Sequence, residues 1–188
     1  FLIVFSAICV AGTLYFIKHD PALIERRLSV GPGAEKEASQ KIIMTAASVC
    51  IVLLYVVPGL DRHFGWSHVP PALVVLGDIG VLLGFLGIFR VFKENSYASA
   101  TVEIGKEQRV IDTGPYAFVR HPMYTAALLM FAATPLALGS YWALLLIIPL
   151  TGVLAWRLSD EERFLIRNLP GYAAYRQRTR YRLIPWVW

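Results

Sequence analysis

The sequence predicts an all-α integral membrane protein, and three observations lead to this fold class. Hydrophobic residues make up 56% of the 188 residues and charged residues only 16%, whereas a soluble domain usually carries about 25% charged residues. The mean hydropathy is +0.55. Several apolar runs have the length of about 20 residues that a helix needs to cross a bilayer. We therefore expect about five transmembrane helices in a single membrane domain over residues 1–188.

Three of the expected spans lie in residues 1–92, at 1–17, 42–60 and 70–89. The first has no basic segment before it and no small-residue cleavage site after it, so we expect a span and not a signal peptide. The second contains no charged residue, and the third contains only Asp78.

Residues 93–188 are expected to form a cofactor-binding connector, a helical hairpin and a tail. Residues 122–156 are a run of 35 without Asp, Glu, Lys or Arg. One straight helix of that length would reach about 52 Å, whereas the hydrocarbon core is about 30 Å thick. We therefore predict two helices, 123–137 and 141–156, with a break marked by Pro135 and Leu138-Gly139-Ser140.

The tail shows a capping pattern, because Ser159 is followed three residues later by Glu162. This pattern predicts a cytoplasmic helix from about residue 160 to 169. Pro170-Gly171 is expected to end it, and a second short helix would carry Tyr172, Tyr175 and Arg178.

Lys and Arg number 5, 1, 5, 0 and 7 in the successive connections and the tail. The positive-inside rule then places the N-terminus outside and the C-terminus in the cytoplasm. The same count puts Arg120-His121 and the Arg-rich tail on one side of the membrane. Because the basic residues flank spans, the net charge of +5 indicates topology and anionic lipid headgroups as the cause, and not nucleic acid.

The densest polar motif is residues 114–124, at the start of the fourth span. Pro122 suits the first position of that helix, whose N-terminus offers free N–H groups and a partial positive charge. Arg120 adds a guanidinium that suits a carboxylate or phosphate. The motif therefore suits an anion site, and the alternative that stays open is a snorkelling Arg120 with a headgroup-binding His121 and a structural Pro122.

Other candidates also have two interpretations. Glu161 and Glu162 suit ribose hydroxyls or a cationic cofactor, or Glu162 caps a helix. Asp78 is either functional or hydrogen-bonded within a closely packed helix face. That face is formed by four glycines that would also permit a homodimer: Gly77, Gly80, Gly84 and Gly87.

Some of the remaining side chains point to packing, and others leave two roles open. The tyrosines near the span ends, Tyr116 and Tyr124 among them, either hold a sulfonium or an adenine or form an interfacial belt. Cys9, Cys50 and the histidines outside the 114–124 motif have no ligand spacing, so we expect no metal site.

Several motifs follow one another in a fixed order: Gly114-Pro115-Tyr116, Val119-Arg120-His121-Pro122-Met123-Tyr124, the hairpin, Glu161-Glu162, Tyr172 with Tyr175 and Arg178, and Ile184-Pro185. Over residues 93–188 this order resembles the isoprenylcysteine carboxyl methyltransferase family, whose wider superfamily includes phospholipid N-methyltransferases. The first 92 residues resemble the family only in their apolar, membrane-spanning character.

The resemblance implies an S-adenosylmethionine-dependent methyltransferase with a cytoplasmic active site and a lipophilic acceptor, most simply a carboxylate on a prenylated small molecule or peptide. It implies a cofactor site formed by the motif residues and by either glutamate: Tyr116, Arg120, His121, Pro122, Tyr124, Glu161 and Glu162. It also implies catalytic or acceptor-positioning roles for Glu162, Arg163 and Arg178.

Two other functions stay open at this point. Sterol reductases carry a similar Arg-His-Pro motif and use NADPH, although they usually have more spans. A membrane scaffold without enzymatic activity would use the same helices for packing alone.

Overall fold

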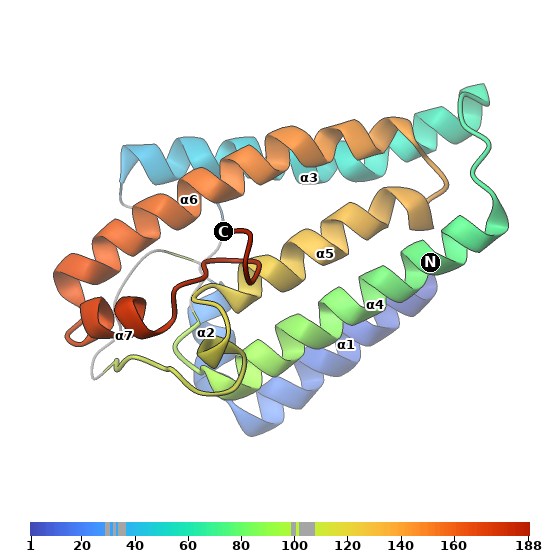
Figure 1. Ribbon diagram of the computed structural model, residues 1–188. Coiled ribbons are helices and arrows are strands. Elements are labelled where there is room, and N and C mark those ends of the chain that lie inside the picture. The colour runs from blue at the N-terminus through green and yellow to red at the C-terminus, as the bar shows by residue number, and fades with distance from the viewer. Residues whose placement is uncertain (29–30, 32, 34–36, 99–100, 102–107) are drawn as a thin grey trace.

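The computed structural model describes residues 1–28, 31, 33, 37–98, 101 and 108–188, and the regular elements within them are helical. The long helices lie side by side in a bundle (Figure 1). In chain order the elements are α1 (Leu2–His19), α2 (Pro21–Leu28), α3 (Ala38–Phe64), α4 (Pro71–Glu94), the 3₁₀ turn η1 (Gly114–Ala117), α5 (Pro122–Ala137), the 3₁₀ turn η2 (Trp142–Leu146), α6 (Ile147–Asn168) and α7 (Tyr172–Arg178). The all-α prediction is confirmed.

Three helices of the described chain are long and apolar enough to cross a membrane: Ala38–Phe64, Pro71–Glu94 and Trp142–Asn168. Two shorter apolar helices accompany them, Phe5–His19 and Pro122–Ala137. The 16 residues of α5 extend about 24 Å, which is less than the hydrocarbon thickness of about 30 Å. The membrane character is confirmed, with three full-length spans and two shorter helices at the five predicted positions.

The hairpin turn lies where the sequence placed it, but Pro135 does not break the helix. Pro135 is buried in the last turn of α5, which continues to Ala137. The reversal follows at Gly139, whose φ of +75° is readily adopted only by glycine. Ser140 N then donates to the Pro135 carbonyl at 2.9 Å, which closes the turn.

The tail helix predicted to start near residue 160 is wrong, because α6 continues without interruption to Asn168. Ser159 does not cap a helix. Its hydroxyl donates to the Ala155 carbonyl at 2.8 Å, as a serine inside a helix does. No Gly or Pro lies between Trp156 and Asn168, so nothing ends the helix. Gly171, with φ +86°, precedes α7 as predicted.

The glycine face of α4 packs against α5 of the same chain. A Cβ added at Gly80 would lie 2.7 Å from Ala133 Cβ, and one at Gly84 would lie 2.6 Å from Met130 Cβ. The predicted close packing is confirmed, and this face is not available for a second copy. Asp78 is exposed on another side of α4, where it lines an apolar groove beside α1 and makes no hydrogen bond with the described residues.

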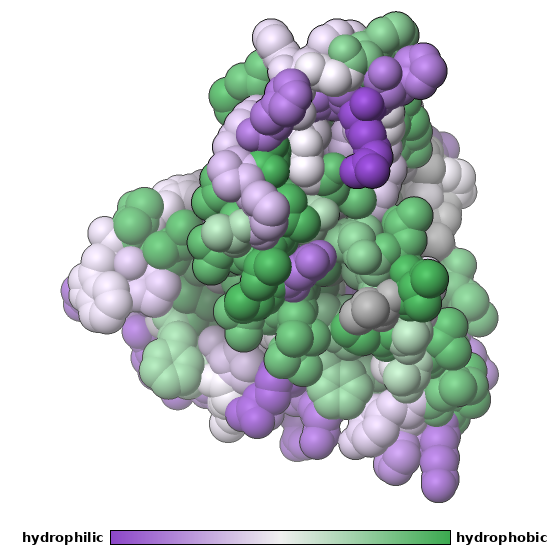
Figure 2. Space-filling view, turned by 90° about the vertical axis from the view of Figure 1, so that its right-hand side faces the viewer, coloured by the Kyte–Doolittle hydropathy of each residue, from purple (hydrophilic) through white to green (hydrophobic). Residues whose placement is uncertain are grey.

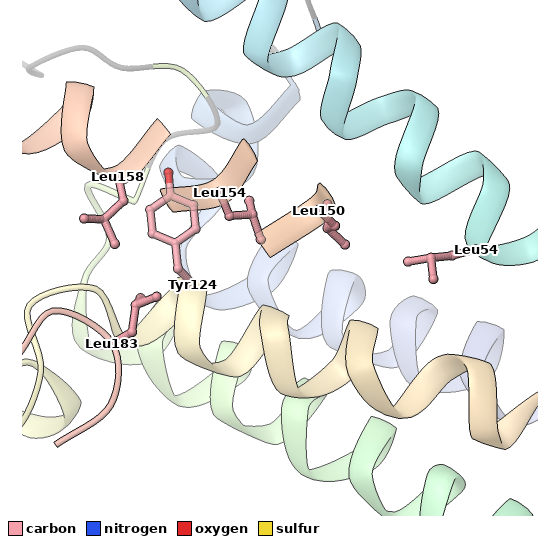
Figure 3. Packing of buried hydrophobic residues seen from close by; sticks show 6 residues of the cluster. All are labelled: Leu54, Tyr124, Leu150, Leu154, Leu158 and Leu183. Carbon is pink, nitrogen blue, oxygen red and sulfur yellow. The ribbon is translucent and has the colours of Figure 1, made fainter. Parts of the chain in front are cut away.

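A hydrophobic core joins α3, α5 and α6 to the C-terminal segment (Figure 3). Tyr124 of α5 and Leu183 of the C-terminal segment lie together beside the leucines of α6. The six buried members are Leu54, Tyr124, Leu150, Leu154, Leu158 and Leu183. This core holds the segment after α7 against the start of α5.

The two ends of the bundle differ in character. α2 and α7 lie toward one end, and the hairpin turn and the α3–α4 connection lie at the other (Figure 1). Figure 2 faces this second end and shows mostly hydrophobic side chains, with hydrophilic ones mainly toward the upper and lower edges. At the first end the Arg26 guanidinium of α2 donates to the carbonyl of Ser96, which follows α4. The segment before α3 and the segment after α4 therefore meet there.

Candidate functional site

The site begins as a backbone pairing between the segment before α5 and the segment after α7. Arg120 N donates to the Tyr181 carbonyl at 2.9 Å, and His121 N donates to the Arg182 carbonyl at 3.0 Å. One turn into α5, the Thr125 hydroxyl donates to the Leu183 carbonyl at 2.7 Å. The C-terminal segment therefore covers the start of α5, and its carbonyls accept from the N–H groups of the two residues just before the helix and from the Thr125 hydroxyl.

Glu162 is the centre of a buried ionic cluster. Arg120 Nε donates to its Oε1 at 2.6 Å, and His121 Nε2 lies 3.3 Å from the same oxygen. Arg182 Nε contacts the other oxygen at 3.1 Å. Glu162 is only 3% exposed. A buried carboxylate needs such partners. In return, Glu162 fixes the orientation of the Arg120 and His121 side chains.

Beside this cluster lies a cavity of about 110 Å³ with strongly aromatic walls. Five of the residues predicted for the cofactor site line it: Tyr116, Arg120, His121, Tyr124 and Glu161. Tyr172 and Tyr175 of α7 complete the aromatic wall. The Tyr175 hydroxyl donates to the Tyr116 carbonyl at 2.8 Å, which fixes α7 against η1.

Glu161 faces the cavity, in contrast to its neighbour. The Tyr124 hydroxyl donates to Glu161 Oε2 at 2.7 Å and accepts from Arg157 Nε at 3.1 Å. Arg157 Nη1 in turn donates to Gln40 Oε1 at 3.0 Å. This chain of bonds connects α3, α5 and α6, and it holds the Glu161 carboxylate at the cavity wall.

Two polar groups at the cavity have no hydrogen-bond partner among the described residues. The Tyr172 hydroxyl is the one buried side-chain polar atom without a hydrogen bond within the described chain. Arg120 donates through Nε and Nη1, the latter to the carbonyls of Thr179 and Arg180, so its Nη2 has no partner among the described residues. Buried polar groups are almost always hydrogen-bonded, so the Tyr172 hydroxyl lacks an expected partner. Arg120 Nη2 is a donor that the described residues leave unused, and both groups suit a bound ligand.

Three tyrosines of the cavity, Tyr116, Tyr172 and Tyr175, are neutral at physiological pH. Burial raises the pKa of the Tyr116 phenol to about 12, and burial also raises the pKa values of Tyr172 and Tyr175. Tyr116 accepts a hydrogen bond from Asn95 Nδ2 at 2.9 Å. The cavity therefore offers neutral aromatic faces beside one carboxylate, that of Glu161, and the side chains of two arginines, Arg109 and Arg120.

The structure keeps four predicted site residues out of the cavity. Glu162 lies behind it, and Pro122 is buried as the first residue of α5. The Arg163 side chain is 65% exposed and pairs with Asp160 at 3.2 Å. The Arg178 side chain is 68% exposed and pairs with Asp112 at 2.8 Å. Neither arginine reaches the cavity lining.

Sequence reasoning missed Arg182, Arg157 and Gln40 as supports of the site. Arg182 is one of several arginines in the tail, and no local pattern separates it from the others. Within the described residues, no group of three or more His, Cys, Asp or Glu side chains could hold a metal ion.

The fold and the site, together with the match of a family model, place the chain among the integral membrane proteins of a methyltransferase family. The model described as phospholipid methyltransferase matches residues 72–170, which include α4, α5, α6 and the Arg-His-Pro motif. The chain belongs to this family. The resemblance seen in the sequence is thereby confirmed at the level of the isoprenylcysteine and phospholipid methyltransferase superfamily.

The chain is also similar to the cobalt-zinc-cadmium resistance protein CzcN of Cupriavidus metallidurans. The two are 30% identical over 139 residues, which cover 70% of this chain and 57% of CzcN. The chain thus spans little more than half the length of this curated relative.

Proposed function

We propose that the protein transfers a methyl group from S-adenosylmethionine to a lipophilic acceptor, most simply a carboxylate as in isoprenylcysteine. The observation that carries the proposal is the aromatic cavity with two unpaired polar groups, the Tyr172 hydroxyl and Arg120 Nη2. S-adenosylmethionine, when bound, supplies a methyl group on a positively charged sulfur, and an acceptor oxygen forms the new C–O bond while the S–C bond electrons remain on sulfur.

The residues at the cavity fit this ligand by their chemistry. Arg120 Nη2 suits the amino-acid carboxylate. The rings of Tyr116 and Tyr172 suit an adenine or a sulfonium cation. Glu161 suits ribose hydroxyls or the ammonium group. Glu162 then acts as a positioning residue that keeps the Arg120 guanidinium oriented.

A carboxylate acceptor needs no general base, because a carboxyl group is already ionised at pH 7. The residues of the site then contribute alignment, which is worth about 7–11 kcal/mol for well-oriented reactants. An amine acceptor would have to lose a proton, and Glu161 is the carboxylate at the cavity that would accept it.

The proposal includes an orientation. The N-terminus lies outside and the C-terminus and the site lie in the cytoplasm, which is supported by the uneven distribution of Lys and Arg. A site at the membrane surface gives a water-soluble methyl donor access from the cytoplasm and an apolar acceptor access from the bilayer.

Thermal unfolding of the purified protein in dodecyl maltoside tests the proposal. A ligand at 100 times its Kd adds about 2.7 kcal/mol to the folded state. We expect S-adenosylmethionine and S-adenosylhomocysteine to raise Tm, and NADPH to leave it unchanged. Stabilisation by NADPH alone would instead favour a reductase. No response from a folded protein to any of the three would favour a scaffold.

A further inference from the structure

A second, apolar groove of about 300 Å³ lies between α1, α2 and α4. Aromatic rings from α1 and α4 form much of its lining, among them Phe16, Phe85 and Phe92. Of the described residues that line it, Arg27 alone carries a charge. The groove therefore combines a surface for a hydrocarbon chain with one cation.

Arg27 has no carboxylate partner among the described residues. Its Nη1 lies 3.7 Å from Met123 Sδ, a weak acceptor, and its guanidinium lies 4.5 Å from the centre of the Phe92 ring. Four other arginines differ, because each pairs with a carboxylate: Arg120, Arg163, Arg178 and Arg182. Burial lowers the pKa of Arg27, and no carboxylate of the described residues compensates the lost hydration. A half-buried, unpaired guanidinium is a site for an anion.

Met123 connects the groove to the reaction cavity. Its side chain contacts Arg27 and also lines the aromatic cavity. An amphiphile with its apolar chain in the groove would therefore present its polar end to the cavity. Arg163 and Arg178, the arginines that the sequence suggested for the acceptor, face solvent and are already paired.

We propose that the groove between α1, α2 and α4 holds the apolar chain of the methyl acceptor and that Arg27 binds its carboxylate. The inference rests on the proposed function and defines the acceptor as a carboxylate-bearing amphiphile. Charge complementarity supports it, because the cation that the groove offers, Arg27, contacts Met123, which lines the cavity.

Binding of two probes to the full chain in nanodiscs of neutral phosphatidylcholine tests the inference. Palmitate carries the carboxylate, and hexadecanol has the same chain without the charge. We expect wild-type protein to bind palmitate about tenfold more tightly than hexadecanol, as one charge-assisted hydrogen bond would give. Arg27→Gln should abolish this difference and leave hexadecanol binding unchanged, and Arg27→Lys should keep part of it. Arg90→Gln is the control for the loss of one positive charge, because Arg90 is exposed on α4.

Three results would overturn the inference. One is an equal affinity of wild-type protein for both probes, and another is an Arg27→Gln variant that still prefers palmitate. The third is displacement of palmitate by phosphatidylglycerol at equal affinity, which would make the groove a site for membrane lipid. Stabilisation by S-adenosylhomocysteine, measured on the same samples, reports separately on the proposed function and shows whether Arg27→Gln is folded. Palmitate selectivity through Arg27 without any response to S-adenosylhomocysteine would remove the methyltransferase proposal alone.

Discussion

Two buried polar clusters lie at opposite ends of this bundle, and they differ in whether their hydrogen bonds are complete. At the hairpin end, Asp61 is 1% exposed. Its Oδ1 accepts from Ser67 N at 2.6 Å, and its Oδ2 accepts from the hydroxyls of Ser67 at 2.6 Å and Ser140 at 2.5 Å. The two hydroxyls in turn accept from Tyr141 N and Ala143 N. Every polar side-chain group in this cluster has a partner.

The cluster around Glu162 contains more charge but is not complete. Both carboxylate oxygens of Glu162 have partners. Arg120 Nη2 and the Tyr172 hydroxyl, in contrast, have no partner within the described residues. Both clusters are buried, so burial alone does not identify a site. A complete network fixes helices to one another, whereas an incomplete one beside a cavity indicates a missing ligand.

The largest expected effect comes from removing the charge that holds the site cluster together. Glu162→Gln leaves Arg120 and Arg182 without their carboxylate, and breaking a buried pair costs about 3–5 kcal/mol. We expect Tm to fall by about 10 °C and the stabilisation by S-adenosylhomocysteine to disappear. Thermal unfolding in detergent with and without the ligand measures both. A variant with wild-type Tm would show that the cluster is not a unit.

Asp61→Asn should separate stability from ligand binding. Hydrogen bonds to a charged group contribute about 1.5–3 kcal/mol each, and Asn cannot accept all three. We expect a loss of about 2 kcal/mol in the free energy of unfolding. The Kd for S-adenosylhomocysteine, measured by calorimetry on the folded variant, should not change. A changed Kd would mean that the two ends are coupled, and the contrast between the clusters would then be wrong.

Tyr172→Phe should do the reverse. It removes an unpaired buried hydroxyl, whose desolvation costs about 1–3 kcal/mol, so the protein without ligand should be as stable as wild type or more so. We expect ligand affinity to fall about tenfold, the value of one hydrogen bond of about 1.4 kcal/mol. Tyr175→Phe is the matched control, because the Tyr175 hydroxyl has a protein partner and its removal should lower stability. Unchanged affinity in Tyr172→Phe would assign its hydroxyl no role in binding.

The smallest effect is expected at Arg163, which the sequence suggested for the site. Its pair with Asp160 is exposed, and such pairs contribute about 0–1 kcal/mol. Arg163→Gln should therefore change Tm by less than about 3 °C. Palmitate affinity in nanodiscs should also stay within about twofold. A loss of palmitate binding comparable to that in Arg27→Gln would return Arg163 to the acceptor site.

The features that the sequence predicted well depend on local patterns. The uncharged runs predicted the positions of the apolar helices, and the glycines of α4 predicted close packing against another helix. Pro122 predicted the first turn of α5. The continuous α6 was missed because Ser159 and Glu162 fit a capping pattern, although nothing before Pro170 ends that helix.

The different roles of Glu161 and Glu162 follow from tertiary structure. Successive residues on a helix point about 100° apart, so only the orientation of α6 decides which carboxylate faces the cavity. The partners of Glu162 lie far away in sequence, since Arg120 is 42 positions earlier. Asp61 gave no signal either, because at the end of an apolar run beside Arg62 it resembled an ordinary interfacial residue.

The contacts of Arg120 with the C-terminal segment have a consequence for biosynthesis. Arg120 Nη1 bonds to the Thr179 carbonyl, 59 positions further along the chain. At about 5–20 residues per second, ribosomes need about 3–12 s to synthesise that stretch. The start of α5 is therefore synthesised several seconds before its partners in the C-terminal segment. Nascent chains remain without a complete ligand site until residues 179–183 have left the ribosome, so ligand binding has to wait for the synthesis of that segment.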